Sequence, residues 1–285
     1  MTLAHRVTDM DGISYRLSIL AGVVLFLCCS VAVAQTVNDS LHDLGASGLA
    51  QGTVPSAGVC VFCHTPHGSD IAAPVPLWNK VMPATGGYQM YSTLNTPSLD
   101  GAEQLLSSSP SLACLSCHDG GQAMDVVLNA PGSGRYNAAG IQIGDGVQVV
   151  AMTGTPIPTL GTDLRDDHPI SIQYAGGGCS DLVTGCTTLG DLDFTTPQYA
   201  SINSNDVWWV DSIGGTATVK EKTDMLLYTR LATVNVAGGG AVEPFVECGS
   251  CHDPHNAATA VVDVSPAFMR VQNLDSVVCR SCHLK

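Results

Sequence analysis

The residue types with the clearest capacity for chemistry are cysteine and histidine, which recur in four copies of C-x-x-C-H. The paired thiols are Cys60, Cys63, Cys114, Cys117, Cys248, Cys251, Cys279 and Cys282, and the adjacent histidines are His64, His118, His252 and His283. Two thiols at this spacing can form thioethers with the vinyl groups of one porphyrin, and the next histidine can bind its iron. One copy alone would also suit a zinc half-site or a redox dithiol. Four copies predict four covalently bound c-type haems.

Four further histidines remain for the other side of each iron. His5 lies in an expected leader peptide, which leaves His42, His67, His168 and His255. Four irons with two axial ligands each need eight histidines, and eight are present. We therefore expect these four to be distal ligands. Methionines are the alternative ligands, and ordinary surface or core histidines are the structural alternative.

Two of these histidines stand in a shared context. His67 and His255 each follow a proximal histidine by three residues, across Pro66 and Pro254. Residues three apart lie on the same side of a turn, and proline turns the preceding residue away from helix. Neither side chain can then easily reach the opposite face of the same iron. We expect each to bind a neighbouring haem, in the simplest assignment His67 the second and His255 the fourth.

The other two candidates have different surroundings. His168 precedes Pro169 and a strand-like stretch at 170–172, so it is either a distal ligand or a turn histidine. His42 lies close to the expected mature N-terminus, where chains are mobile unless something ties them down. A bond to iron would do so, either in the first haem of the same chain or in another subunit.

Short helical turns must carry the motifs. Ser109 and Pro110 predict the start of a helix that runs through Cys117, and Asp275 is placed to cap the turn before Cys279. Residues 120–245 hold no such motif and contain strand-like pieces at 141–150, 207–210 and 216–219. The predicted fold is mostly irregular, with short helices around a stacked tetrahaem core and some small β-elements in a haem-free, loop- and β-rich insertion at about 120–245.

The first thirty-four residues are typical of an export signal. Arg6 and Arg16 precede an apolar run that ends in Ala32-Val33-Ala34, a small-residue cleavage site. We expect cleavage after Ala34, with an uncleaved anchor as the alternative, and one tetrahaem domain at 35–285. The rest of the chain has no apolar run of spanning length, so no membrane span is expected in the mature protein. The expected location is extracellular or at the cell surface, or alternatively the periplasm.

The composition excludes one class of function and indicates how the core is built. The formal net charge of −14 argues against nucleic-acid binding, which needs a basic surface. Aromatic residues make up only 5% of the chain, so porphyrins must supply much of the core. Cys179 and Cys186 lack a following histidine and should form a local disulfide in an oxidising compartment. A structural Ca²⁺ site is less favoured than solvated acidic turns for two groups of carboxylates, Asp163, Asp166 and Asp167, and Asp191 and Asp193.

Several strings of the sequence resemble a known family. They are Leu41–Leu44, Cys60–Gly68, Cys114–Gly120, Asp167–Ser171, Cys248–Asn256 and Cys279–His283. These strings are similar to the exported multihaem c-type cytochromes of metal-reducing bacteria, and most similar to tetrahaem, OmcE-like filament subunits. The resemblance implies bis-histidine haems in a continuous stack and one distal histidine donated across a subunit boundary, for which His42 is the candidate. It is thin across 120–165 and 175–245.

Three functions compete on this basis. The first is an electron conduit that polymerises into extracellular filaments, and the second is a monomeric periplasmic or surface electron carrier. The third is a multihaem reductase, which needs an iron with an open coordination position. Eight histidines for eight axial positions leave none open, so we do not expect an enzyme. Expected partners are copies of the same chain, other cytochromes and external electron acceptors.

Overall fold

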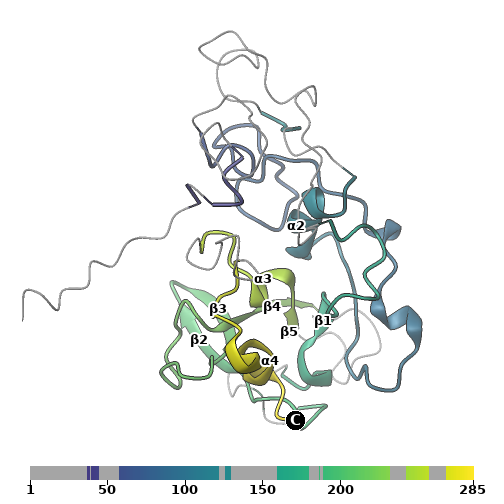
Figure 1. Cartoon of the computed structure of the whole chain (residues 1–285), viewed down its shortest axis with the longest axis vertical. Helices are drawn as coiled ribbons and strands as arrows, with labels where there is room; N and C mark the ends of the chain where they lie inside the picture. Colours follow the sequence, from purple (N-terminus) through teal and green to yellow (C-terminus); the bar gives the residue numbers. More distant parts are fainter. Residues whose placement is uncertain are drawn as a thin grey trace, which may run out of the picture. The chain divides into compact units, whose positions relative to one another are not determined.

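A computed structural model describes residues 37–38, 40–44, 58–121, 126–129, 159–179, 186, 189–231, 242–256 and 268–285 (Figure 1). All of them belong to the second of two units into which the chain divides, Thr36–Lys285. The expected leader at 1–34 and the strand expected at 141–150 lie outside the described residues. Within the described part, no helix is both long and apolar enough to cross a membrane.

An antiparallel sheet is the largest regular element (Figure 1). Its five strands are β1 (Ile172–Gln173), β2 (Gln198–Ile202), β3 (Asn205–Val210), β4 (Met225–Leu231) and β5 (Val242–Val246), and they pair in the order β1-β5-β4-β3-β2. A two-residue turn joins β2 to β3, and its residues Asn203 and Ser204 both have positive φ. Such turns suit hairpins because their twist matches that of the strands.

Of the strand predictions that fall on described residues, one is confirmed, one is confirmed in part and one is wrong. The stretch 207–210 is found as the end of β3, and β1 keeps only part of the expected 170–172 stretch. The prediction for 216–219 is wrong, because this stretch is a turn in the connection from β3 to β4. There the Glu221 carboxylate accepts hydrogen bonds from the backbone and the hydroxyl of Thr216. These local bonds replace the ladder that a strand would need.

The main hydrophobic core joins the sheet to the C-terminal segment. Its buried members include Trp208, Val210, Met225, Leu227, Met269 and Val278. Trp208 and Met225 have no exposed surface. Full burial of a large apolar side chain contributes about 1.5–3 kcal/mol. The few aromatic residues are therefore concentrated where the sheet meets the last two motifs.

Three short α-helices coincide with motifs. They are α2 (Ser111–His118), α3 (Cys248–Cys251) and α4 (Val277–Cys282), and four 3₁₀ turns accompany them: η1 (Thr85–Gly87), η2 (Tyr91–Leu94), η4 (Tyr174–Gly176) and η6 (Leu274–Ser276). Helix α2 begins one residue after Pro110. The expected cap at Asp275 is wrong, because the side-chain carbonyl of Asn273 accepts the Val278 N–H instead.

The remaining cysteines and acidic turns are also described. Cys179 and Cys186 form the expected disulfide. The Asp163 carboxylate accepts two hydrogen bonds from the Arg165 guanidinium at 2.7 and 2.6 Å. Asp193 pairs with Lys285. Both carboxylates thus face cations of the chain, and a structural Ca²⁺ site stays the less favoured interpretation.

Candidate functional site

Each C-x-x-C-H motif is a single helical turn that ends at its histidine. In three motifs the histidine N–H donates to the carbonyl of the first cysteine, at 2.8 Å for His64, 3.0 Å for His252 and 2.8 Å for His283. This turn places the two cysteine side chains, three residues apart, on one side. His252 and His283 then adopt extended backbone angles, which directs the chain out of the helix.

The same short bridge follows three of the motifs. The proximal histidine pairs antiparallel with a distant residue: His64 with Trp78, Phe194 with His283, and His252 with Met269. In the third motif, the Asp253 N–H donates to the Phe268 carbonyl and the Arg270 N–H donates to the Cys251 carbonyl, both at 2.8 Å. Each motif is therefore fixed to a segment outside itself. The second motif differs, because the His118 carbonyl accepts the Leu160 N–H after a longer helix.

The central observation is that three proximal histidines each face a distal candidate. The ring centroids are 6.2 Å apart for His42 and His118, 6.2 Å for His64 and His255, and 6.4 Å for His168 and His283. A metal–imidazole bond is about 2 Å and the centroid lies roughly 1.2 Å behind the nitrogen, so two imidazoles across one metal have centroids roughly 6.4 Å apart. The three separations fit that arrangement.

These pairings differ from the simplest sequence-based assignment. His255 lies by His64 of the first motif, where the sequence suggested the fourth. His42 lies by His118 of the second motif, for which the sequence suggested His67. The sequence-based assignment used proximity along the chain, whereas the bridges bring distant segments together, so the ring pairs differ from it while the ligand assignment itself stays a prediction.

The remaining two histidines are placed differently. His67 is exposed, and its backbone carbonyl accepts hydrogen bonds from Thr65 and Asn129. In the described part of the chain, its ring contacts no other histidine ring. His252 is also exposed, and it lies near enough to His42 to contribute to lowering that residue's pKa.

In four of the six paired histidines, Nδ1 lies close to an acceptor. Nδ1 lies 2.8 Å from the Pro76 carbonyl in His64, 2.9 Å from the Pro169 carbonyl in His168, and 3.4 Å from the Pro254 carbonyl in His42. In His255 it faces the Asp253 carboxylate at 3.6 Å. Because a carbonyl only accepts, Nδ1 carries the proton in the first three rings. This tautomer leaves Nε2 free to bind metal, and hydrogen-bond acceptors at Nδ1 orient metal-binding histidines in the same way.

Packing and charge further define the His42 ring. It stacks on Phe268 with centroids 4.1 Å apart and planes 14° apart. Burial, and then the neighbouring His118, lower the pKa of His42 to about 4. The ring is therefore neutral at physiological pH, which is the form that binds metals. Burial, and then His168, also lower the pKa of His283.

The cysteines show that consecutive motifs are neighbours. Burial, and then Cys117 of the second motif, raise the pKa of Cys63 to about 12. A hydrogen bond from Cys114 to Cys248 raises the pKa of the former thiol and lowers that of the latter. Burial, and then Cys251 of the third motif, raise the pKa of Cys282 to about 12. The first motif thus lies by the second, the second by the third, and the third by the fourth.

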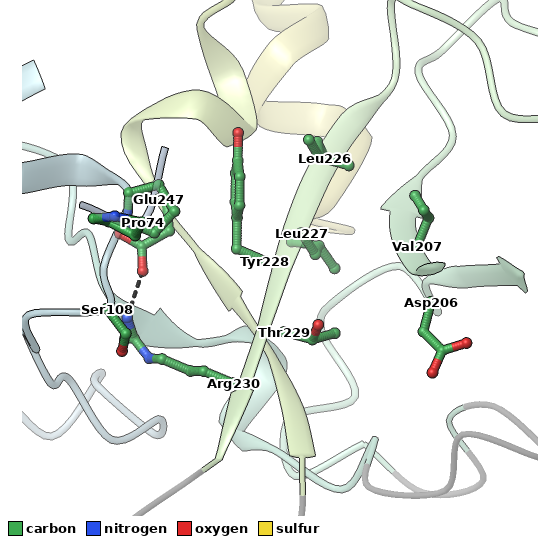
Figure 2. A pocket seen from close by; sticks show the side chains of 11 residues that line it. Pro74, Ser108, Asp206, Val207, Leu226, Leu227, Tyr228, Thr229, Arg230 and Glu247 are labelled. Atoms are coloured by element: carbon green, nitrogen blue, oxygen red, sulfur yellow. Dashed lines mark hydrogen bonds and ion pairs between the residues drawn. The ribbon is translucent and has the colours of Figure 1, made fainter. Parts of the chain in front are cut away.

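A buried ion pair connects the second and third motifs. The Arg230 guanidinium donates to one oxygen of Glu247 at 2.6 Å, and hydroxyls of Ser111 and Ser171 donate to the other at 2.5 and 2.9 Å. Ser111 opens α2, while Glu247 precedes Cys248 and caps α3. Arg230 and Glu247 also line a cavity of about 290 Å³ next to β4 (Figure 2). Sequence reasoning missed this network, since its members lie far apart in the chain.

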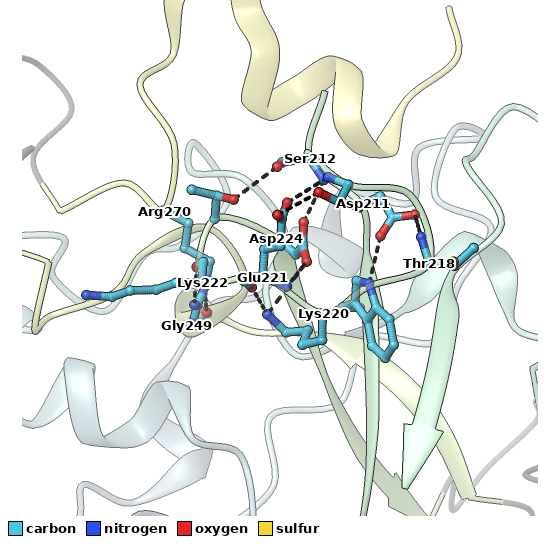
Figure 3. Close-up of polar contacts among 12 residues, drawn as sticks. Asp211, Ser212, Thr218, Lys220, Glu221, Lys222, Asp224, Gly249 and Arg270 are labelled. Atoms are coloured by element: carbon cyan, nitrogen blue, oxygen red, sulfur yellow. Dashed lines mark hydrogen bonds and ion pairs between the residues drawn. The ribbon is translucent and has the colours of Figure 1, made fainter. Parts of the chain in front are cut away.

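A second set of polar contacts ties the connection from β3 to β4 to the third motif (Figure 3). The Arg270 side chain donates to the Gly249 carbonyl at 2.9 Å and to the Lys222 carbonyl at 3.3 Å. Within the connection, Asp224 accepts the backbone N–H groups of Ser212 and Glu221 at 3.0 and 2.5 Å. The connection from β3 to β4 is thereby linked through Arg270 to the third motif.

Comparison with known proteins adds no family assignment. No protein-family model matches the chain, and no curated protein matches it.

Proposed function

We propose that this protein is an electron carrier with four covalently bound c-type haems. The observation that carries the proposal is the set of three histidine pairs at 6.2–6.4 Å, each joining a C-x-x-C-H histidine to a distant one. Zinc half-sites or redox dithiols would not need these pairs. Each haem supplies an iron that alternates between the ferric and ferrous states.

The residues of the chain have separate roles in this function. The eight motif cysteines attach the four groups, and His64, His118, His252 and His283 bind the irons from one side. His255, His42 and His168 serve as distal ligands of the first, second and fourth sites. Adjacent motifs keep the sites in series, which suits transfer from one to the next. With His67 as the second ligand of the third site, every iron would be held by two histidines, and we therefore do not propose an enzyme.

Export to the cell surface or beyond, with assembly into filaments, extends the proposal. The contacts of His42 favour a ligand role within its own chain, although they do not test its donation to another subunit. The exposed His67 is the better candidate for a ligand that crosses to a neighbouring subunit. The second candidate function is a monomeric carrier, in which His67 would bind the third site of its own chain.

The composition of the purified exported protein tests the carrier function. Its mass should exceed that of the cleaved chain by four haems, and its ferric absorption spectrum should be wholly low-spin. Two or fewer haems would contradict the proposal, and a high-spin fraction would contradict full histidine ligation.

Negative-stain microscopy of native material tests assembly. Filaments are expected for the unmodified protein. Both His67→Ala and His42→Ala should leave one iron with a single histidine and produce high-spin iron, but only His67→Ala should abolish the filaments. Monomeric particles in the unmodified protein would favour the second candidate function.

A further inference from the structure

Asp253 stands out among the groups that hold the ligand histidines. One of its carboxylate oxygens accepts the His255 backbone N–H at 3.0 Å and lies 3.6 Å from Nδ1 of the same residue. The other oxygen lies 3.8 Å from the Lys222 ammonium. The Asp253 N–H is itself bound to the Phe268 carbonyl. Backbone and side chain therefore both fix this carboxylate next to the His255 ring.

The acceptor for His255 differs in charge from the other three. Nδ1 of His42, His64 and His168 meets a neutral proline carbonyl. A carboxylate draws the Nδ1 proton more strongly, so the imidazole becomes a more basic ligand. A more basic axial ligand favours the ferric over the ferrous state, because hydrogen bonding to the axial ligand is one of the protein's means of setting the potential.

We propose that Asp253 is a positioning residue that directs Nε2 of His255 toward His64 and lowers the reduction potential of the haem held by that pair. The inference rests on the proposed function. The potential of the first site would then lie below the value that a neutral acceptor would give there, so an electron would reside at this site less than with a neutral acceptor.

The surroundings support a lasting interaction. The Asp253 side chain is 13% exposed, whereas the His255 side chain is 62% exposed. The carboxylate is thus shielded while the ring edge faces water. Lys222 neutralises part of the charge but attracts the oxygen that faces away from the ring.

The chain offers a matched control for this residue. Asp119 follows His118 as Asp253 follows His252, but its carboxylate accepts hydrogen bonds from the Tyr88 hydroxyl at 2.7 Å and the Gly121 N–H at 2.6 Å. Asp253→Asn gives His255 a neutral amide oxygen, the class of acceptor that the other three histidines have. Asp119→Asn removes the same charge at the same motif position, where the carboxylate is bound by Tyr88 and Gly121.

The test is a spectroelectrochemical titration of the haem-loaded full chain. In Asp253→Asn, one quarter of the haem absorbance should titrate at a higher potential than in the unmodified protein, with the rest unchanged. In Asp119→Asn any shift should be smaller. Equal shifts in the two variants, or no shift in Asp253→Asn, would overturn the inference.

Two further measurements separate the inference from the proposed function. Haem count and spin state of the unmodified protein are measured first, and fewer than four low-spin haems there would count against the function itself. If Asp253→Asn instead shows one high-spin haem, Asp253→Glu decides. Recovery of the low-spin signal supports positioning by the carboxylate, and no recovery refutes it.

Discussion

Two regions of the molecule are held together by different means. Residues 58–129 hold the first two motifs, and their described part contains no strand of the sheet. Their apolar groups gather in small clusters, such as Phe62, Val61 and Cys63, which pack with Leu44 from outside the region. Residues 189–285 hold the last two motifs around the sheet and the main core. The first region thus has less apolar packing of its own and, under the proposed function, would depend more on its haems.

In the first region, the buried side chain of Asn79 connects several segments by hydrogen bonds. Asn79 is fully buried, and its amide donates to the Val61 and Asn129 carbonyls at 2.6 and 3.0 Å. Its side-chain carbonyl accepts the Asn129 N–H at 2.8 Å, and its backbone N–H donates to the Cys63 carbonyl. These bonds connect the first motif to two loops. Hydrogen bonds of this kind specify a geometry but each adds only about 0.5–1.5 kcal/mol net.

Withholding haem should have the largest effect and separates the regions directly. In the haem-free chain, limited proteolysis should cut within residues 58–129 first, because little apolar burial offsets the entropy of ordering them. A fragment that spans 189–285 should survive longer. Equal resistance of both regions, read by mass spectrometry of the digest, would contradict the comparison.

The core of the second region predicts the next largest effect. Trp208→Ala should lower the free energy of unfolding by about 3–5 kcal/mol, because it opens a cavity under the sheet. Denaturant titration of the haem-loaded protein measures this loss. Leu192, whose surface is 78% exposed, is the control, and Leu192→Ala should change the free energy by less than about 0.5 kcal/mol. Similar losses in the two variants would show that the sheet does not form the core.

The polar centre of the first region predicts a smaller loss. Asn79→Ala leaves the Val61 and Asn129 carbonyls without their amide donor, which should cost about 1–3 kcal/mol. The exposed Gln272 provides a control amide, and Gln272→Ala should have little effect in the same denaturant titration. If Asn79→Ala lowered the free energy of unfolding as much as Trp208→Ala does, the two regions would not differ in how they are stabilised.

The turn between β2 and β3, in the second region, gives the smallest expected effect, which is an increase in stability. Ser204 has φ of 62°, a conformation that costs a residue with a side chain roughly 1–2 kcal/mol. Ser204→Gly should raise the melting temperature slightly. Ser201→Gly, in an exposed position of β2, should lower it, since glycine loses more entropy in a strand. The opposite order of the two melting temperatures would refute the turn geometry.

Sequence reasoning predicted local chemistry better than long-range placement. The disulfide of Cys179 and Cys186 follows from spacing and expected compartment, and it is confirmed. Partners could not be derived for His255 or His42, because the bridges that place them join residues far apart. The Asp275 cap failed for a local reason, since Asn273 competes for the same N–H. The order of the strands in the sheet could not be predicted, because β1 has only two residues and pairs with β5, which is far away in the sequence.

If the chain is exported as proposed, the interleaved histidine pairs would set the order in which the sites are completed. Both members of the His42 and His118 pair emerge early in translocation from the N-terminus. His64, in contrast, must wait for His255 near the end of the chain. Under the proposed function, the second site is the first to gain both ligands, and the first site stays incomplete until almost everything has crossed. A chain truncated before residue 255 should then mature its second site and leave its first with a single histidine.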